Sequence, residues 1–169
     1  AGIASSASAF SALALCVASA EQDIKAQGLN IGFNKDTDKK NFFQKASIAA
    51  RLGSGSACRS VFGGYTLWGS TQGVQSSSNE HAVTLDGVHK TFENMKDTIL
   101  IVEEEPKKIS SSQGHALMQQ HIFKEQRIIQ ARENLTDMLS ILKKGDMEGF
   151  IRIVETEALT LHALMMTSR

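Results

Sequence analysis

The most constraining feature of this sequence is a run of fifteen residues, 51–65, that is rich in small and polar side chains. It holds four glycines, three serines and two arginines. Glycine lets the backbone approach a ligand closely, serine hydroxyls can donate to an anion, and arginine offers a planar fork for phosphate or carboxylate oxygens. The run therefore predicts an anion-binding turn, lined by Ser54, Gly55, Ser56 and backbone N–H groups, with Arg59 supplying the charge.

A flexible Gly/Ser linker that happens to contain an arginine is the alternative interpretation of the same run. Linkers of that kind are seldom followed directly by apolar, strand-forming residues. Here the run leads into the segment 61–68, which reads Val-Phe-Gly-Gly-Tyr-Thr-Leu-Trp. The anion-binding turn is the favoured interpretation, and we place it at residues 52–64.

The first residues predict a second anion-binding element. Residues 1–8 contain a glycine and three serines, and apolar residues recur at helical spacing from Ala9 to Ala20. Ser5 or Ser6 could cap this helix, whose positive N-terminal end would favour phosphate. Taken alone, the segment favours the alternative of a capped Ala/Ser-rich helix without a ligand.

Three motifs resemble the mevalonate diphosphate decarboxylases of the GHMP kinase superfamily, and they occur along the chain in the order expected for that family. Gly-Ser-Gly-Ser-Ala-Cys-Arg-Ser at 53–60, followed by Val-Phe-Gly-Gly-Tyr, resembles the signature of that family. Ala-Gly-Ile-Ala-Ser-Ser-Ala-Ser at 1–8 is similar to its ATP-phosphate loop, and 107–114 resembles its segment between a core strand and a helix. The resemblance is weakest at 21–40 and 69–92.

The resemblance implies an α+β fold, with helices packed on a mixed or antiparallel sheet. Residues 1–105 would complete an N-terminal ATP-binding domain, and 106–169 would begin a C-terminal helical domain. It also implies a homodimer. Because the family motifs begin at residue 1, we expect an internal fragment of a larger protein that is inactive by itself.

The implied reaction is ATP-dependent decarboxylation of mevalonate 5-diphosphate to isopentenyl diphosphate, with ATP and Mg²⁺ as cofactors. By resemblance, Gly2, Ala4, Ser5 and Ser6 would bind the ATP phosphates. The turn residues Ser54, Gly55, Ser56 and Arg59 would bind the substrate diphosphate. No match to the family's catalytic aspartate turn is found, so the catalytic residue stays unknown. Ser110 and Ser111 would form a second wall of the phosphate site, although ordinary helix capping explains them equally well.

Two other interpretations stay open at this point. One is a different GHMP-family kinase or decarboxylase, acting on mevalonate 5-phosphate or on mevalonate. The other is a non-catalytic remnant of the fold that serves binding or assembly. The arginine-bearing turn argues against a kinase that does not decarboxylate, since such kinases lack that run.

Composition limits the classes of partner and the setting. Eighteen basic residues balance eighteen acidic ones, which gives no support for a nucleic-acid or membrane-surface partner. Two cysteines, Cys16 and Cys58, have no zinc or disulfide spacing, so a reducing, cytosolic setting is expected. The five histidines do not share a helical face, and we expect no metal site made of protein side chains.

The rest of the chain predicts ordinary secondary structure. A polar surface connection is expected at 21–40, a helix at 42–52, short strands at 65–68 and 82–85 around a turn-rich loop, and a buried strand at 98–102. Three glutamates at 103–105 would alternate in direction, which suits a solvated strand end better than a metal cluster. From 121 to 168 the pattern is helical, with a helix end at Lys143-Lys144-Gly145 and a Met/Leu stripe expected in the core.

Overall fold

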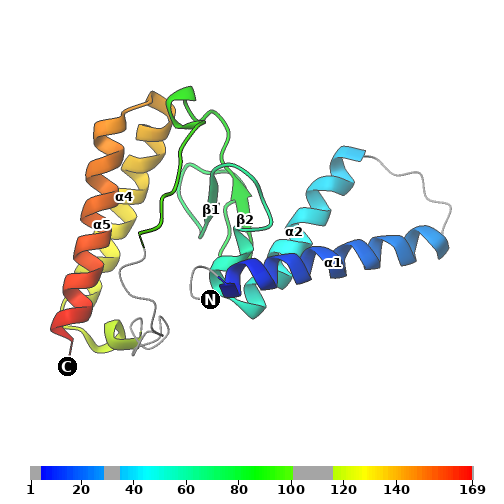
Figure 1. Ribbon diagram of the computed structural model, residues 1–169, viewed down its shortest axis with the longest axis horizontal. Coiled ribbons are helices and arrows are strands. Elements are labelled where there is room, and N and C mark those ends of the chain that lie inside the picture. Colours follow the sequence, from blue (N-terminus) through cyan, green and yellow to red (C-terminus); the bar gives the residue numbers. More distant parts are fainter. Residues whose placement is uncertain (1–4, 29–34, 101–115, 169) are drawn as a thin grey trace. The chain divides into compact units, whose positions relative to one another are not determined.

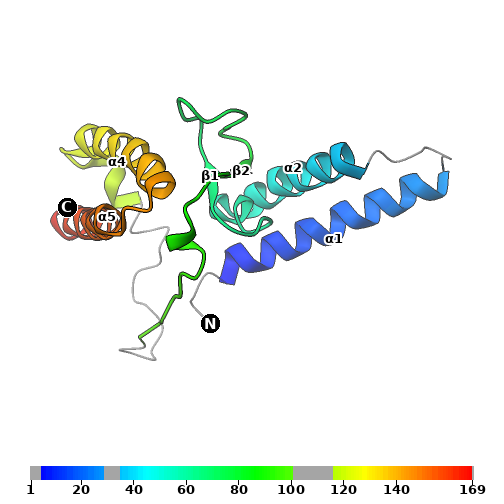
Figure 2. The ribbon, with the colours of Figure 1, turned by 90° about the horizontal axis from the view of Figure 1, so that it is seen from above.

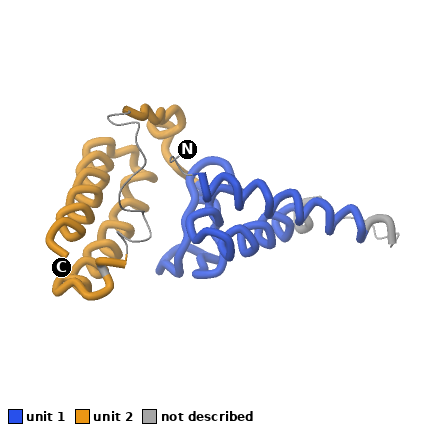
Figure 3. The backbone as a smooth tube through the Cα atoms, turned by 60° about the horizontal axis from the view of Figure 1, so that its bottom comes forward, with its two compact units in different colours: residues 1–86 blue, residues 87–169 orange. Residues whose placement is uncertain are grey.

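The computed structural model describes residues 5–28, 35–100 and 116–168. The chain divides into two compact units, Ala1–Asp86 and Gly87–Arg169, which Figure 3 distinguishes by colour. The domain boundary predicted between residues 105 and 106 falls outside the described residues and stays a prediction. Each unit is described by itself below.

Two long helices dominate the first unit. Helix α1 spans Ser5–Gly28 and α2 spans Lys35–Gly53, and the two lie side by side (Figures 1 and 2). Alanine has the highest helix propensity and the smallest side chain that still buries apolar surface, so alanine faces let two helices approach closely. The buried cluster consists of Ala7, Ala14, Ala46, Ala50, Ala57 and Val61. Both helices predicted at these positions are confirmed.

The predicted surface connection at 21–40 is wrong over most of its length. Residues 21–28 are the last turns of α1, and residues 35–40 are the first turns of α2. Glu, Gln, Lys and Ala are good helix formers, and Glu21 pairs with Lys25 one turn later in the favourable orientation. Lys45 of α2 also approaches Glu21, at 3.4 Å between Nζ and Oε1. At 21–25 and 39–40 the polar side chains are exposed or half-buried, so polarity there marks a solvated helix face.

A turn and a small sheet follow α2. The 3₁₀ helix η1 spans Gly55–Cys58, and strands β1 (Thr66–Trp68) and β2 (Ala82–Thr84) pair antiparallel, with Leu67 opposite Val83. Both predicted strands are confirmed. The loop between them turns through residues with positive φ, Gly69, Gly73 and Ser76, as its turn-rich composition predicts. Helices with a two-stranded sheet confirm the expected α+β class.

The second unit is built on a helical hairpin. Helix α4 spans Lys124–Lys144 and α5 spans Met147–Thr167, and they are preceded by two 3₁₀ turns, η2 (Lys90–Phe92) and η3 (Met118–Gln120). Gly145 ends α4 in the left-handed conformation at φ 78°, which confirms the predicted helix end. Asp146 then caps α5, accepting a hydrogen bond from the Gly149 N–H at 2.9 Å.

Two sequence expectations fail in this unit. Residues 98–100 of the predicted buried strand form no strand, and Ile99 and Leu100 are 52% and 82% exposed. Residues 101 and 102 lie outside the described residues. A β-branched run becomes a strand only where a neighbour takes its backbone hydrogen bonds, and 98–100 pair with no described strand. The Met/Leu stripe is core only in part: Leu142 is 5% exposed, but Leu159 is 70% exposed.

No helix within the described ranges is both long and apolar enough to cross a lipid bilayer.

Candidate functional site

The predicted phosphate loop lies at the start of α1. Gly2 and Ala4 fall outside the described residues, whereas Ser5 and Ser6 stand in the first turn of the helix. Residues 5–8, predicted to belong to a loop, are therefore helical. Backbone N–H groups in a first helical turn have no intrahelical partner, so this end of α1 is where an anion would be favoured.

A serine pair joins this helix end to the anion turn. The hydroxyls of Ser6 and Ser54 lie 3.4 Å apart, although 48 residues separate them in the sequence. Ser54 has an extended backbone and its side chain makes no capping bond to η1, which leaves its hydroxyl facing Ser6. The structure thus brings together two segments to which the sequence analysis assigned anion binding.

Glycine in the turn serves close packing. A Cβ atom at Gly55 would lie 3.0 Å from Cη2 of Trp68, so a larger residue there would have to displace the indole ring. The ring is held in place by a hydrogen bond from its Nε1 to the Asn79 carbonyl, 2.9 Å long. Packing against Trp68 explains Gly55 without a ligand, and its predicted contact with the substrate stays a prediction.

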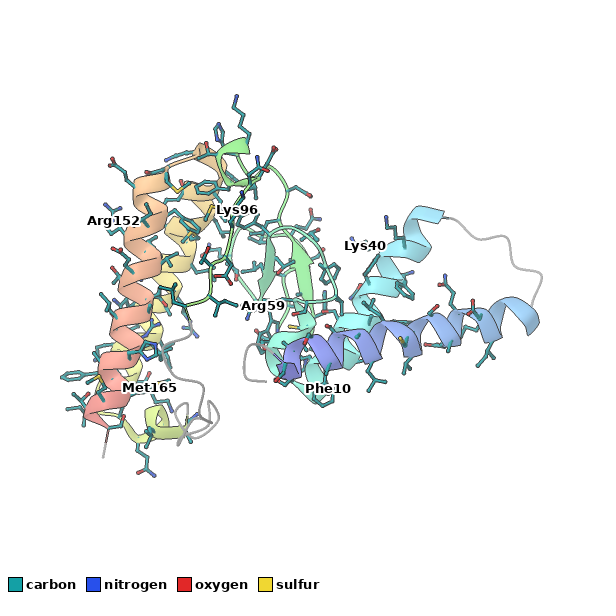
Figure 4. The ribbon with its side chains drawn as sticks, in the orientation of Figure 1. Phe10, Lys40, Arg59, Lys96, Arg152 and Met165 are labelled. Carbon is teal, nitrogen blue, oxygen red and sulfur yellow. The ribbon has the colours of Figure 1, made fainter. Side chains whose placement is uncertain are left out.

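The two arginines of the run have different surroundings. Arg51 donates from Nε to the Glu80 carbonyl at 3.0 Å, which ties the end of α2 to the loop before β2. Arg59, which Figure 4 labels, is exposed. Its guanidinium has no hydrogen bond or ion pair to any residue that the structure describes. A guanidinium without a protein partner can take both oxygens of an anion, so Arg59 is the cation that suits the predicted role.

A buried serine of α2 holds the backbone of the anion turn through hydrogen bonds. Ser47 of α2 is 0% exposed, and its hydroxyl donates to the Cys58 carbonyl at 2.8 Å and accepts from the Ala82 N–H at 2.9 Å. The peptide unit between Cys58 and Arg59 is therefore held at both ends, because the Arg59 N–H donates to the Ser56 carbonyl at 3.2 Å. Ser47 fixes the backbone from which the Arg59 side chain departs.

Sequence reasoning missed Ser47, although a signal was present. It is a serine on the apolar face of a helix, between Ala46 and Ala50, and a buried hydroxyl needs partners. Such a residue predicts a buried polar link, but the sequence does not say which distant backbone groups it joins.

The cysteine of the anion turn, Cys58, has a thiol of low reactivity. Cys58 is 0% exposed and not in a disulfide. Burial raises the pKa of its thiol, and this outweighs the lowering that the nearby Arg59 charge produces. The thiol is therefore protonated at neutral pH and is a poor nucleophile.

Other predicted site residues can be placed as follows. Ser110 and Ser111 lie outside the described residues, so their suggested role at the phosphate site stays a prediction. Over the described ranges, no group of three or more His, Cys, Asp or Glu side chains is arranged to hold a metal ion.

Comparisons with known proteins point to one family. A family model described as "Diphosphomevalonate decarboxylase-like N-terminal domain" matches residues 1–82. The diphosphomevalonate decarboxylase of Eremothecium gossypii is 31% identical over 99% of this chain and 38% of its own length. That of Saccharomyces cerevisiae is 28% identical over 99% of this chain and also 38% of its own length.

A third relative, the diphosphomevalonate decarboxylase of Gibberella zeae, is 32% identical over 69% of this chain and 31% of its own length. The chain thus spans less than two fifths of the length of these relatives. No solved structure matches the chain significantly. The matched residues 1–82 contain both Ser6 and the whole anion turn.

Proposed function

The chain belongs to the diphosphomevalonate decarboxylase family, and from that premise we propose that the whole protein catalyses ATP-dependent decarboxylation of mevalonate 5-diphosphate. ATP would phosphorylate the tertiary 3-hydroxyl and leave as ADP. The 3-phosphate and the carboxylate would then depart as inorganic phosphate and CO₂, which leaves the double bond of isopentenyl diphosphate. The enzyme would act in the cytoplasm as a homodimer.

The serine pair is the observation that carries this proposal. Phosphoryl transfer requires the donor and acceptor to be held about 3–3.5 Å apart and in line, so the ATP site and the substrate site must be neighbours. Ser6 belongs to the segment proposed to bind ATP, and Ser54 to the turn proposed to bind the substrate. Their hydroxyls are 3.4 Å apart.

Each segment then has a distinct role. Ser5 and Ser6, with Gly2 and Ala4, would bind the ATP phosphates at the positive end of α1. Ser54, Gly55 and Ser56 would line the diphosphate of the substrate through hydroxyl and backbone groups. Arg59 would neutralise and orient that diphosphate, because its side chain has no ion-pair partner in the described part of the chain. Ser110 and Ser111 would complete the wall of the phosphate site.

Mg²⁺ is proposed to arrive on the ATP phosphates. This ion commonly keeps several waters and uses substrate phosphates as ligands, and it needs few protein groups. When bound, it would neutralise charge on the phosphates of ATP. The roles given above to the serines and to Arg59 do not depend on where it sits.

The proposal is tested on the whole protein, incubated with ATP, Mg²⁺ and mevalonate 5-diphosphate, by following ADP and CO₂ together. Equal release of both products is the expected result. ADP without CO₂ would show a kinase that stops at the phosphorylated intermediate. Neither product would overturn the substrate assignment, and mevalonate 5-phosphate and mevalonate would then distinguish another family activity from a non-catalytic protein.

A further inference from the structure

The first unit contains a large cavity that the proposed reaction does not use. Its volume is about 780 Å³, and it lies between the N-terminal half of α2, the end of the anion turn, the loop before β2 and β2 itself. The residues that line it are Lys39, Lys40, Phe43, Gln44, Phe62, Gly63, Ser76, Ser77, Ser78, His81, Ala82, Val83 and Thr84. None of the described residues assigned to the substrate or to ATP is among them.

The charged side chains among the described residues that line this cavity are both basic. Lys39 and Lys40 line it from α2, and both are exposed (Figure 4 labels Lys40). Among the side chains that the structure describes, neither lysine has an ion-pair partner and no aspartate or glutamate lines the cavity. His81 adds a further polar group. An anion would therefore be attracted here.

Aromatic rings form the apolar part of the lining. The rings of Phe43 and Phe62 lie 5.8 Å apart between centroids and are tilted by 36°. Both side chains are half-buried, so part of their surface faces the cavity. Flat apolar surface of this kind favours an aromatic group, which gains from burial and from ring contacts.

The loop before β2 lines the cavity with three serines, Ser76, Ser77 and Ser78. This loop is braced by hydrogen bonds and contains a residue with a strained backbone. The Ser77 hydroxyl accepts from the Thr71 N–H at 3.0 Å and donates to the Thr71 carbonyl at 3.1 Å, and Ser78 accepts from the Glu80 N–H. Ser76 has a φ of 63°, the only positive value for a non-glycine residue among those described. Such strain persists only where surrounding structure maintains it, and it clusters at ligand sites.

We propose that this cavity is a second ligand site, which binds an organic anion made of an aromatic ring and a phosphate group. The ring would pack on Phe43 and Phe62, and the phosphate would lie between Lys39 and Lys40. The volume is within the range of about 300–1,000 Å³ that small-molecule sites occupy. The site is separate from Ser54 and Arg59, and it does not depend on the reaction proposed above.

The test uses 1-naphthyl phosphate, titrated into the chain by calorimetry. Saturable binding is expected, with inorganic phosphate alone and 1-naphthol alone each binding at least about tenfold more weakly, because each keeps only half of the contacts. Raising the salt concentration should weaken binding, since the two lysines are exposed. Pyrophosphate, the probe for the anion turn, should not compete.

Variants decide whether the cavity is responsible. The double variant Lys39→Gln/Lys40→Gln should lose at least about tenfold in affinity. The matched control is Lys45→Gln, because Lys45 is on the same helix but outside this cavity. Phe43→Leu keeps an apolar side chain while removing the ring, and it should weaken 1-naphthyl phosphate but not inorganic phosphate. Circular dichroism checks that each variant is folded.

Three results would overturn this inference. The first is an absence of saturable binding to the unmodified chain. The second is an equal loss of affinity in the Lys45→Gln control and in the double variant. The third is competition between pyrophosphate and 1-naphthyl phosphate, which would place the probe in the anion turn.

Discussion

The interiors of the two units are built from different kinds of residue. In the first unit the most buried side chains are small, and Ala46, Ser47 and Ala57 are all 0% exposed. In the second unit the buried side chains are large: Phe92, Ile141, Leu142 and Ile153. The second unit also relies on caps and on an ion pair, in which Arg127 grips the Glu157 carboxylate with two hydrogen bonds.

This difference teaches why the candidate site belongs to the first unit. Small side chains let backbones approach one another, so a single hydroxyl such as Ser47 can link α2, the anion turn and β2. Large aliphatic side chains keep the two helices of a hairpin further apart and fix their packing. The small-residue packing of the first unit brings polar groups within hydrogen-bonding distance of one another, whereas the large side chains of the second unit mainly stabilise the helical hairpin.

The largest effect is expected from Ser47→Ala. The change leaves the Cys58 carbonyl and the Ala82 N–H without a partner, and each buried unpaired group costs about 1–3 kcal/mol. We expect the free energy of unfolding of the first unit to fall by about 2–4 kcal/mol, as measured by urea unfolding. Ser60→Ala, at an exposed position, is the control. An equal loss in both variants would show that the buried link is unimportant.

Crowding the small-residue core should have the next largest effect. Ala50→Leu adds three carbons at a position that is 1% exposed, and overpacking of this kind costs about 1–3 kcal/mol. The neighbouring Ala49 is exposed, so Ala49→Leu should change stability by less than about 0.5 kcal/mol. Thermal unfolding of both variants measures the difference. Similar midpoints would contradict the close packing of α1 on α2.

The ion pair makes the second unit sensitive to acid. Burial would raise the pKa of Glu157, but hydrogen bonds from Arg127 and Asn134, with the Arg127 charge, bring it below the usual 4.5. Since the folded state holds this proton more weakly than the unfolded state does, the stabilisation is complete above about pH 5 and is lost as pH falls through the lowered pKa.

Glu157→Gln should therefore destabilise the second unit by about 1–2 kcal/mol at pH 7 and by progressively less below pH 4. Urea unfolding of the variant and of the unmodified chain, at pH 7 and below pH 4, measures how their free energies of unfolding converge. Glu155→Gln provides the control, because Glu155 is exposed and has no ion pair within the described residues. A difference between Glu157→Gln and the unmodified chain that stays constant with pH would exclude the carboxylate as its source.

The smallest effect is a difference in reactivity between the two thiols. Cys16 is exposed on α1, whereas Cys58 is buried and burial raises its pKa. Brief treatment of the folded chain with iodoacetamide at pH 7.5 should modify Cys16 alone, and both residues should react in urea. Peptide mass spectrometry identifies the modified residue. Rapid modification of Cys58 in the folded chain would mean that the anion turn opens readily.

Local patterns predicted local structure well. The glycine after two lysines marked the end of α4, and the β-prone residues on both sides of the turn-rich loop marked β1 and β2. The same reasoning failed where tertiary surroundings decide. The polar residues 21–28 and 35–40 are helical, and residues 98–100 have no strand beside them within the described ranges.

The sequence indicated which residues could form the candidate site, but it did not predict the long-range contacts that bring them together. Glycine and serine content indicated the anion turn, and Arg59 was singled out by its chemistry. The contact between Ser6 and Ser54 joins residues 48 positions apart, and the bonds of Ser47 reach 11 and 35 residues along the chain. Such separations depend on how helices pack, which a single sequence does not state.

The most direct test of the account is whether the anion turn binds a diphosphate through Arg59. Calorimetric titration of the chain with pyrophosphate should show saturable binding, which Arg59→Gln weakens by about 10- to 100-fold, in line with the loss of charge-assisted hydrogen bonds. Arg51→Gln is the matched control, because Arg51 already donates to the Glu80 carbonyl, and it should retain nearly full affinity. Binding that both variants share with the unmodified chain would contradict the role given to Arg59.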